Sequence, residues 1–240
     1  MSARTAAGAL PDWEQVLSAA ARLQVLLPGA VLVGGTAAGL PAGHRASRDA
    51  DHVLTDLRSH LDTVLGQLES AAGWRTARVN RPVLILGSLD GIETGIRRLI
   101  RAEPLETTTR SVGDQQITIP TEAEILRIKG FLLLRRNATR DYVDFAAVAD
   151  RIGYSATAEA CARFDVLYPQ PSGESALQQM LAQLASPKPY DLDGTTLAEY
   201  RHLEARWHDW EAIRTACVRA ATVIFDHVCD LDEPGSARPA

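Results

Sequence analysis

The chain has 240 residues, of which 46% are hydrophobic and 23% are charged, a composition that supports a buried core and is typical of globular proteins. Its formal net charge of −5 excludes a protein that binds nucleic acid through overall charge, although a local basic patch is compatible with it. No stretch approaches the roughly 20 apolar residues of a membrane span, and no apolar signal segment follows Met1. We therefore expect a cytoplasmic protein with no membrane segment.

The first half of the chain alternates between helical and extended patterns. Asp12 is placed to cap a helix that Pro28-Gly29 ends, and a buried strand over 30–33 leads into Gly34-Gly35 and a short helix over 36–40, ended by Pro41. We then expect a strand over 49–54, a helix capped by Asp56 and ended by Gly73, strands over 74–79, 83–89 and 92–100 with a hairpin turn at Asp90-Gly91, and short extended pieces over 105–110 and 116–119. This order predicts a small mixed sheet with helices, of α+β or α/β type.

From Thr121 onward nearly all patterns are helical. Thr121 and Glu124 form a predicted capping box, in which Glu124 reaches back to Thr121, for a helix that runs to about Arg136. A break at Asn137 would let Thr139 cap the next helix, 140–151, and further helices are expected over 156–167, 173–185 and 196–230, the last with a tryptophan stripe that packs in a core or between domains. The prediction is a sheet domain over 1–120 and a helical domain over 121–232, with disordered ends at 1–10 and 233–240.

The cysteines suggest no chemistry. Cys161, Cys217 and Cys229 are odd in number and match no zinc or redox spacing. We expect buried, reduced thiols.

The first chemical motif is a pair of carboxylates that follows a glycine pair. Asp49 and Asp51 are separated by one residue, so on an extended chain both side chains leave the same face. Two such carboxylates repel each other unless a cation lies between them, and Mg²⁺ shared with a triphosphate is one common solution. The Gly34-Gly35 backbone could approach phosphate oxygens at the start of a helix. The alternative is a surface Asp pair and an ordinary glycine turn.

The second motif gathers cations and carboxylates at helical spacing. Its members are Lys129, Arg136, Arg140, Asp141 and Asp144. On a continuous helix the three cations would lie within about 20° of one direction, and with a break near Asn137 they would form a helix end that faces a helix start. Lys and Arg suit a triphosphate, and the aspartates could orient them. The alternative is a solvated helix face with an Arg140–Asp144 pair.

These two motifs together resemble a known family. Gly34-Gly35-Thr36, then His44-Arg45-Ala46-Ser47-Arg48-Asp49-Ala50-Asp51, and finally Lys129, Arg136 and Arg140-Asp141-Tyr142-Val143-Asp144 match in order the motifs of the AbiEii/AbiGii nucleotidyltransferase toxins of type IV toxin–antitoxin pairs. That family is close to mycobacterial toxins that modify tRNA ends. The resemblance implies a polymerase-β-like nucleotidyltransferase core, an α+β mixed sheet with helices, followed by an α-helical C-terminal domain.

The resemblance also implies roles for individual residues. Asp49 and Asp51 would hold Mg²⁺ (or Mn²⁺), and the metal would help a hydroxyl attack the α-phosphate of an NTP. The implied nucleotide-binding residues are Gly34, Gly35, Thr36, His44, Arg45, Ser47, Lys129, Arg136 and Arg140. Lys129 would contact phosphates, and Asp141 or Asp144 would complete the catalytic site. A third carboxylate on a later strand is expected; Glu93 is favoured over Asp90, and otherwise the base would be Asp141 or Asp144.

The leading hypothesis is therefore a toxin that moves NMP from an NTP to RNA such as tRNA, with a cognate antitoxin as a possible partner. A second hypothesis is a nucleotide- or partner-binding module without catalysis, and a third is transfer to a small-molecule or protein hydroxyl. The acidic net charge keeps the third open, since tRNA binding needs a basic face. Candidates for that face are Arg75, Arg78, Arg81, Arg97, Arg98, Arg101, Arg135 and Arg136.

Overall fold

The computed structural model describes residues 12–232, so both ends expected to be disordered lie outside the described residues. The chain forms two compact units. The sheet unit contains the described residues up to 36 together with 47–98 and 109–118. The helical unit contains 37–46, 99–108 and the described residues from 119 onward.

The sheet unit is built on a five-stranded mixed sheet. Its elements, with the hairpin that follows, are α1 (Trp13–Leu26), β1 (Val31–Leu32), α2 (Gly34–Ala42), β2 (His52–Leu54), α3 (Leu57–Glu69), β3 (Trp74–Asn80), β4 (Leu84–Leu89), β5 (Ile92–Arg98), β6 (Thr107–Val112) and β7 (Gln115–Pro120). The strand order is β1-β2-β5-β4-β3; β2 and β5 are parallel and the other pairs are antiparallel. Strands β6 and β7 form a separate two-stranded sheet, and α2 begins in one unit and ends in the other.

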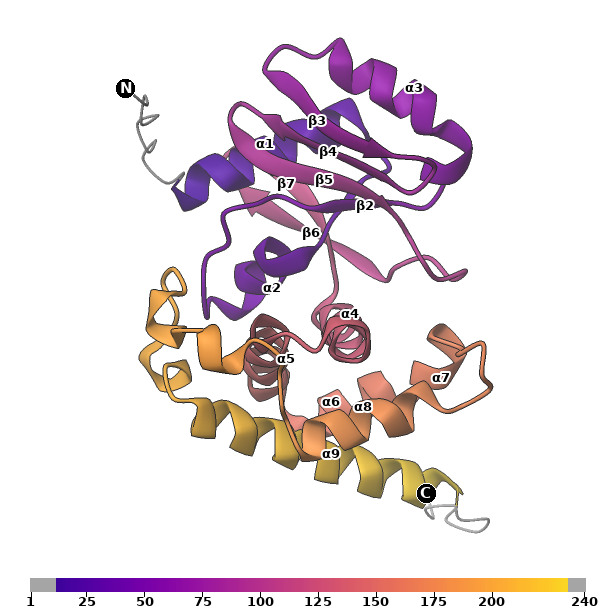
Figure 1. Cartoon of the computed structure of the whole chain (residues 1–240), viewed down its shortest axis with the longest axis vertical. Helices are drawn as coiled ribbons and strands as arrows, with labels where there is room; N and C mark the ends of the chain where they lie inside the picture. Colours follow the sequence, from indigo (N-terminus) through magenta and orange to yellow (C-terminus); the bar gives the residue numbers. More distant parts are fainter. Residues whose placement is uncertain (1–11, 233–240) are drawn as a thin grey trace. The chain divides into compact units, whose positions relative to one another are not determined.

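Helices α1 and α3 cover one face of the sheet (Figure 1). Leu23 and Leu27 from the α1 region and Leu57, Leu61 and Leu68 from α3 form one core with the strand residues Trp74, Ile85, Leu89 and Ile96. The predicted cap of α1 is confirmed, because Asp12 and Gln15 exchange side-chain and backbone hydrogen bonds as a capping box. The opposite face of the sheet carries the polar residues Arg75 and Arg78 of β3 and Glu93 and Arg97 of β5.

The hairpin turn between β4 and β5 lies where it was predicted. Asp90 and Gly91 have φ values of 52° and 82°, the left-handed pair that a two-residue turn needs to match the twist of its strands. Gly91 has no side chain to resist this conformation, and Asp tolerates it better than most residues. The carboxylate of Asp90 pairs with Arg22 of α1, which commits this carboxylate to the turn.

Two predictions around the glycine pair are wrong in detail. The helix begins at Gly34 and continues through Pro41 to Ala42; since it ends one residue later, the proline disturbs only its last turn. The second strand covers only His52–Leu54. Burial nevertheless alternates from Asp49 onward: Ala50, His52 and Leu54 are buried, while Asp49, Asp51 and Val53 are partly exposed. The one-sided arrangement expected of a strand therefore begins before the strand itself.

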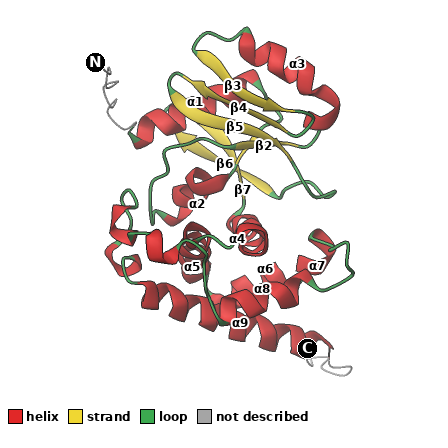
Figure 2. Cartoon of the chain, viewed as in Figure 1, coloured by secondary structure: helices red, strands yellow, loops and turns green. Residues whose placement is uncertain are grey.

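The helical unit contains α4 (Glu122–Arg136), α5 (Thr139–Ile152), α6 (Tyr154–Cys161), α7 (Phe164–Leu167), α8 (Ala176–Ala185) and α9 (Trp210–Asp232). Beyond residue 120 the described chain contains helices, turns and loops but no strand (Figure 2). Helix α5 lies in the centre of this core, with Tyr142, Phe145 and Val148 fully buried. The predicted class, a mixed sheet with helices followed by a helical part, is confirmed.

Three local predictions in this unit are wrong. The helix expected over 196–230 begins only at Trp210, after short 3₁₀ turns at Leu192–Gly194, Leu197–Glu199 and Ala205–Trp207, although Trp207 is buried in the core as expected. Thr121 accepts from the N–H of Glu124, but the Glu124 carboxylate pairs with Arg101 and Arg127 instead of closing a capping box. Thr139 is the first residue of α5 and not its cap. Its hydroxyl and its backbone N–H both donate to the Asp191 carboxylate.

Two further sequence expectations concern membranes and thiols. None of the helices in residues 12–232 combines the length and hydropathy that crossing a membrane requires. All three cysteines are free; Cys161 and Cys217 are buried as expected, whereas Cys229 is exposed. Burial raises the pKa of Cys161 to about 12, which makes it a poor nucleophile at neutral pH.

Candidate functional site

The segment Asp49–Asp51 has no regular secondary structure, yet its backbone is fixed by several elements of the sheet unit. Three hydrogen bonds tie it down: Val33 N–H to the Asp51 carbonyl (2.8 Å), the Thr36 hydroxyl to the Asp49 carbonyl (2.5 Å) and Ala50 N–H to the Glu93 carbonyl (2.9 Å). These partners come from the end of β1, from α2 and from β5. The position of both carboxylates is thus set by the sheet.

The carbonyl of Ala50 carries two more hydrogen bonds on the buried side. The Thr94 hydroxyl donates to it, and Nδ1 of His52 lies 2.8 Å from it. Burial lowers the pKa of His52 to about 4, against hydrogen bonds to backbone that act in the opposite direction, so this imidazole is neutral at pH 7. Neither residue was selected from the sequence. The only available signal was the period of two, which places His52 on the face opposite the aspartates.

The carboxylates themselves are partly exposed and lie among polar groups. The Ser47 hydroxyl donates to Asp49, and the Asp51 carboxylate lies 3.8 Å from the guanidinium of Arg97. The Ser47 hydroxyl therefore forms a hydrogen bond with Asp49, a candidate metal ligand. The Thr36 hydroxyl is likewise used by the Asp49 backbone, which leaves only its N–H for a phosphate.

Two glycines lie next to Asp51. A Cβ on Gly95 would lie 2.6 Å from Asp51 Oδ1, and a Cβ on Gly34, where φ is +76°, would lie 3.6 Å from the Asp51 Cβ. Gly95 therefore lets the carboxylate lie directly against β5, whereas a Cβ at Gly34 would be in ordinary van der Waals contact with Asp51. No group of three or more His, Cys, Asp or Glu side chains that could hold a metal occurs within residues 12–232. Two carboxylates alone fit Mg²⁺, which commonly takes one or two and fills its remaining positions with substrate phosphates and water.

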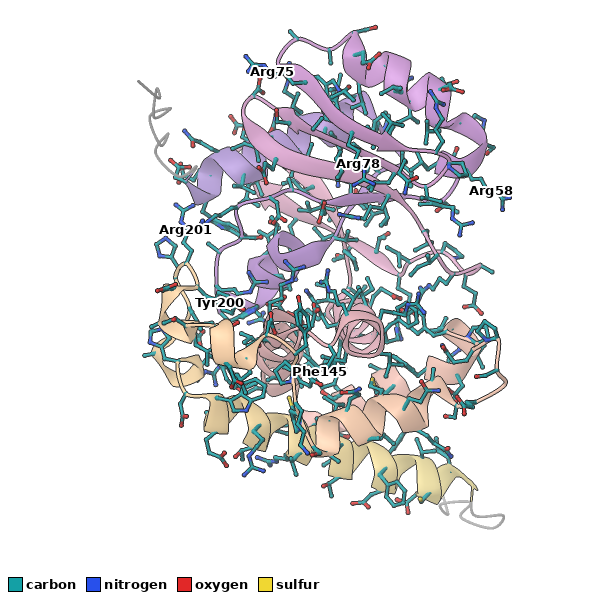
Figure 3. The ribbon with its side chains drawn as sticks, viewed as in Figure 1. Arg58, Arg75, Arg78, Phe145, Tyr200 and Arg201 are labelled. Carbon is teal, nitrogen blue, oxygen red and sulfur yellow. The ribbon has the colours of Figure 1, made fainter. Side chains whose placement is uncertain are left out.

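The register of the sheet places further charged residues on the Asp51 face. Leu86 pairs with Gly95 and Arg78 with Leu86, and in the next row Ser88 pairs with both Glu93 and Arg75. Paired residues point to the same side of a sheet, and an irregularity between Thr76 and Arg78 puts both arginines on that side. Arg75 and Arg78 are exposed on the edge strand β3 (Figure 3).

Arg97 also lies on the Asp51 face, but the remaining candidate arginines do not join it in one surface. Arg98 follows Arg97 at the end of β5, and Arg81 pairs with Asp62. In the helical unit Arg101 is buried against Glu124, and Arg136 binds Asp141. Arg101 is thereby removed from any nucleic-acid face.

A second cluster, centred on Asp144, lies inside the helical unit. The Asp144 carboxylate accepts from Nε2 of His44 (2.7 Å) and from Nε and Nη2 of Arg45 (2.6 and 2.8 Å), and it pairs with Nζ of Lys129 (2.6 Å). All of its oxygen positions are therefore engaged. His44 and Arg45 precede the Asp pair in sequence, whereas Lys129 comes from α4.

Asp141 extends this cluster along α5. It accepts from Lys129 (3.2 Å) and from Nε and Nη2 of Arg136 (2.6 and 2.9 Å). Lys129 is 2% exposed and both carboxylates are fully buried. The cluster contains Lys129, Arg45 and Arg136 against Asp141 and Asp144, an excess of one positive charge before any charge on His44 is counted.

The cations govern the ionisation of both aspartates. Burial alone would raise the pKa of Asp144, but Arg45, Lys129 and His44 outweigh it and hold this pKa well below its usual range. Burial acts the same way on Asp141, and Lys129 and Arg136 lower its pKa overall. Both groups are thus carboxylates at neutral pH and weak proton acceptors.

The solvated-face alternative for this cluster is wrong. Asn137 adopts the left-handed conformation (φ 44°, ψ 44°) and ends α4, so the continuous-helix geometry does not exist and α5 turns the aspartates toward Lys129. Arg140 is exposed. The Arg140–Asp144 pair that the spacing would allow is replaced by bonds to residues distant in sequence.

Residues 44–46 are also bound to the segment before α9. The Glu204 N–H donates to the His44 carbonyl (2.9 Å), and the Ala46 N–H donates to the Arg201 carbonyl (2.8 Å). The guanidinium of Arg45 lies 5.9 Å from the ring centre of Tyr200, which is a cation–π contact. Tyr200 and Arg201 are labelled in Figure 3. His44 and Arg45, expected to bind nucleotide, therefore make their visible contacts within the protein.

Curated proteins with similar sequences are mycobacterial MmpL11 proteins. The match with the "Heme uptake protein MmpL11" of Mycobacterium tuberculosis is 28% identical over 239 residues and covers 92% of this chain and 24% of that protein. The match with the "Mycolic acid-containing lipids exporter MmpL11" of Mycolicibacterium smegmatis is 33% identical over 135 residues, with coverages of 52% and 13%. The chain spans about a quarter of the length of the first of these relatives, and their transport functions are not carried over to it.

Solved structures with similar folds include nucleotidyltransferase-like proteins. An antigenic nucleotidyltransferase-like protein from Paracoccidioides brasiliensis is 19% identical, with 75% of this chain and 90% of that chain covered and a TM-score of 0.49. The antibiotic-resistance factor ANT(2'')-Ia is 11% identical, with coverages of 63% and 93% and a TM-score of 0.45. No protein-family model matches the chain. These identities and TM-scores are too low to decide what the chain does. Its function has to be argued from its own side chains.

Proposed function

We propose that the chain is a nucleotidyltransferase that moves NMP from an NTP to an acceptor hydroxyl, with Mg²⁺ or Mn²⁺ held by Asp49 and Asp51. The observation that carries this proposal is the Asp49–Asp51 segment. Its backbone is hydrogen-bonded to β1, α2 and β5, and the absence of a side chain on Gly95 lets the Asp51 carboxylate lie against β5. A pair of fixed, accessible carboxylates beside a glycine-initiated helix supports the binding of a metal and a triphosphate.

In the proposed reaction the acceptor oxygen bonds to the α-phosphorus, the bond from that phosphorus to the β-phosphate oxygen breaks, and pyrophosphate leaves. A bound metal would supply neutralisation of the phosphate charge. The N–H groups of Gly34, Gly35 and Thr36 lie in the first turn of α2, where N–H groups have no acceptor within the helix, and they would hold phosphate oxygens. The hydroxyl proton must then pass to a base.

Glu93 is the carboxylate best suited to take that proton. It is exposed on β5, two residues before Gly95, and the sheet register supports its placement on the Asp51 face. Asp90 is bound to Arg22. Asp141 and Asp144 are surrounded by cations that lower their pKa values, so they are better suited to hold Lys129 and Arg136 than to accept protons.

The cations of the helical unit are of the kind that bind nucleotide phosphates. The side chain of Arg136 is 36% exposed and binds Asp141. Arg140, exposed on α5, can add a second guanidinium. Lys129 would act through the charge it contributes to this cluster.

We assign RNA such as tRNA as the acceptor, with transfer to a small-molecule or protein hydroxyl as the alternative. The support for RNA is the pair Arg75 and Arg78 on the Asp51 face of the sheet. Arg78 lies two strands from Gly95, about 10 Å away, a distance that a short stretch of phosphodiester backbone spans. This local basic edge answers the objection that the net charge is −5.

The deciding experiment is incubation of the full-length chain with each α-labelled NTP, Mg²⁺ and total tRNA. We expect label on tRNA from the wild type and none from Asp51→Asn. Label transferred by Asp51→Asn would refute the assigned chemistry. Label on the protein or on a small molecule would move the acceptor to the alternative class, and NTP binding without any product would favour a binding module.

The toxin role and a cognate antitoxin are also part of this proposal, and they rest on the two sequence motifs. Induced expression should then arrest growth of a host cell, and Asp51→Asn should relieve the arrest. Equal arrest by both proteins would separate toxicity from nucleotidyl transfer. A small protein encoded beside the chain that restores growth would identify the antitoxin.

A further inference from the structure

Two side chains on the buried side of the sheet bind the backbone of Ala50, the residue between the two proposed metal ligands. Ala50 is buried, and its carbonyl accepts from the Thr94 hydroxyl and from Nδ1 of His52. A carbonyl oxygen has two lone pairs, so its accepting capacity is filled. The same residue donates its N–H to Glu93 (2.9 Å).

Both donors are themselves buried and come from different strands. Thr94 of β5 is 5% exposed and His52 of β2 is fully buried, so water has little access to replace either bond. Because the Ala50 carbonyl can only accept, the bond between them requires the proton on Nδ1 of His52. The backbone of Ala20 also interacts with this ring, so the imidazole is held between two backbone segments.

We propose that Thr94 and His52 are positioning residues for the carboxylate pair, which hold the Ala50 peptide so that Asp49 and Asp51 both project away from the core. The burial pattern fits this role, because Ala50 and His52 face the core while both aspartates are partly exposed. The proposal rests on the proposed function only in that the pair binds a metal; it does not need the transfer reaction. Loss of either donor would let this peptide rotate and separate the carboxylates.

The test measures Mn²⁺ binding to the full-length chain from the electron paramagnetic resonance signal of free Mn²⁺. Thr94→Val keeps the shape but removes the hydroxyl, whereas Thr94→Ser restores it. We expect Thr94→Val to weaken Mn²⁺ binding about 10-fold, the usual effect of losing a group that orients a metal ligand, and Thr94→Ser to bind within about 3-fold of the wild type. Urea unfolding of each variant verifies that it is folded.

His52 offers a second matched pair. Asparagine places its amide nitrogen near the Nδ1 position and can still donate to Ala50, whereas glutamine reaches toward Nε2 and cannot. We expect His52→Asn to keep more Mn²⁺ affinity than His52→Gln. With an NTP substrate, Thr94→Val should lower kcat at saturating nucleotide and leave the KM for NTP nearly unchanged.

The outcomes separate this proposal from the function itself. Wild-type protein that binds Mn²⁺ but transfers no label would remove the function and leave the positioning role. Equal Mn²⁺ affinity in Thr94→Val and Thr94→Ser would overturn the positioning role, whatever their stabilities. Wild-type protein that binds no Mn²⁺ would overturn it as well.

Discussion

Gly95 shows how a single missing methyl group can define a site. A Cβ at this position would lie 2.6 Å from Asp51 Oδ1 and 3.0 Å from a methyl carbon of Leu86. Leu86 lies within β4 and the Asp51 backbone is hydrogen-bonded to Val33, so the carboxylate would have to rotate. The glycine thus matters because of close approach and not because of an unusual backbone angle.

We therefore expect Gly95→Ala to weaken Mn²⁺ binding by about 10-fold or more, because the displaced carboxylate loses its orientation. Calorimetric titration of the folded protein measures this. Gly66→Ala is the matched control, since Gly66 lies within α3 with open space around it; it should bind Mn²⁺ normally and gain up to about 1 kcal/mol of stability. Normal binding by Gly95→Ala would show that the space has no role.

The buried aspartates of the helical unit predict a dependence of stability on pH. The pKa of Asp141 is lowered in the folded chain by Lys129 and Arg136, with the neighbouring Asp144 acting against them. A lowered folded-state pKa stabilises the protein above the unfolded pKa of about 3.9, and this stability is lost as the pH falls toward the folded value.

Accordingly, Asp141→Asn should lower the free energy of unfolding by about 3 kcal/mol near pH 7, because it leaves Lys129 and Arg136 with less compensation. The difference from the wild type should be constant between pH 7 and 5 and should shrink below about pH 4. Urea unfolding at each pH measures both chains. A difference that grows in acid would contradict the assignment of Asp141 as an ionised, cation-bound group.

At the scale of elements, the break at Asn137 determines whether the second motif forms a cluster at all. Asn137 ends α4 in the left-handed conformation, and its side chain donates to the Lys188 carbonyl (2.8 Å) and accepts from the Tyr142 hydroxyl (2.6 Å). These bonds fix the turn that brings Asp141 and Asp144 of α5 onto Lys129. A continuous helix would instead have exposed this motif along one face.

We expect Asn137→Ala to destabilise the chain by about 2 kcal/mol, since alanine is unfavourable in the left-handed region and loses both hydrogen bonds. Asn137→Gly should lose less, because glycine accepts the backbone conformation. Thermal unfolding of the two variants compares these terms. Both variants lose the same side-chain bonds, so their difference measures the backbone conformation; a glycine variant less stable than the alanine variant would contradict the assigned cost of the left-handed conformation.

Element positions were predictable where the signal is local. The cap at Asp12 and the Asp90-Gly91 turn depend on residues within four positions of each other, and both were confirmed. Glu124 was not predictable, because Arg101 and Arg127 compete for its carboxylate through tertiary contacts. The helix expected from 196 failed for a related reason: apolar spacing marked Trp207 as buried but could not distinguish a 3₁₀ turn from a helix.

The candidate site was predictable only in part. A spacing of two residues predicts that Asp49 and Asp51 project from the same face of an extended chain. The observed burial pattern from Asp49 to Leu54 agrees with this prediction. The hydrogen bond from Thr94 depends on a parallel β2–β5 pairing that joins strands about 40 residues apart, whereas the bond from His52 is local. The same pairing opens the space at Gly95, which no local pattern indicates.

At the scale of the whole molecule, the question is how a chain of net charge −5 would hold RNA. Charge averaged over the chain is repulsive, but the electrostatic interaction is screened within about 8 Å at physiological ionic strength. The charges near the bound backbone therefore decide affinity. The β3 edge presents Arg75 and Arg78 on one face, with Arg58 of α3 also exposed in the same unit (Figure 3).

This view makes a quantitative prediction about salt. Each phosphate contact on single-stranded RNA contributes about −0.7 to the slope of log affinity against log salt concentration. Replacing Arg75 and Arg78 together by glutamine should therefore flatten the slope by about 1.4, weaken tRNA binding and leave Mn²⁺ binding unchanged. Filter binding between 50 and 200 mM salt measures the slope. Arg135→Gln is the control, because Arg135 is exposed in the helical unit and lies outside the proposed surface; a loss equal to that of the β3 pair would mean that binding follows total charge and not this edge.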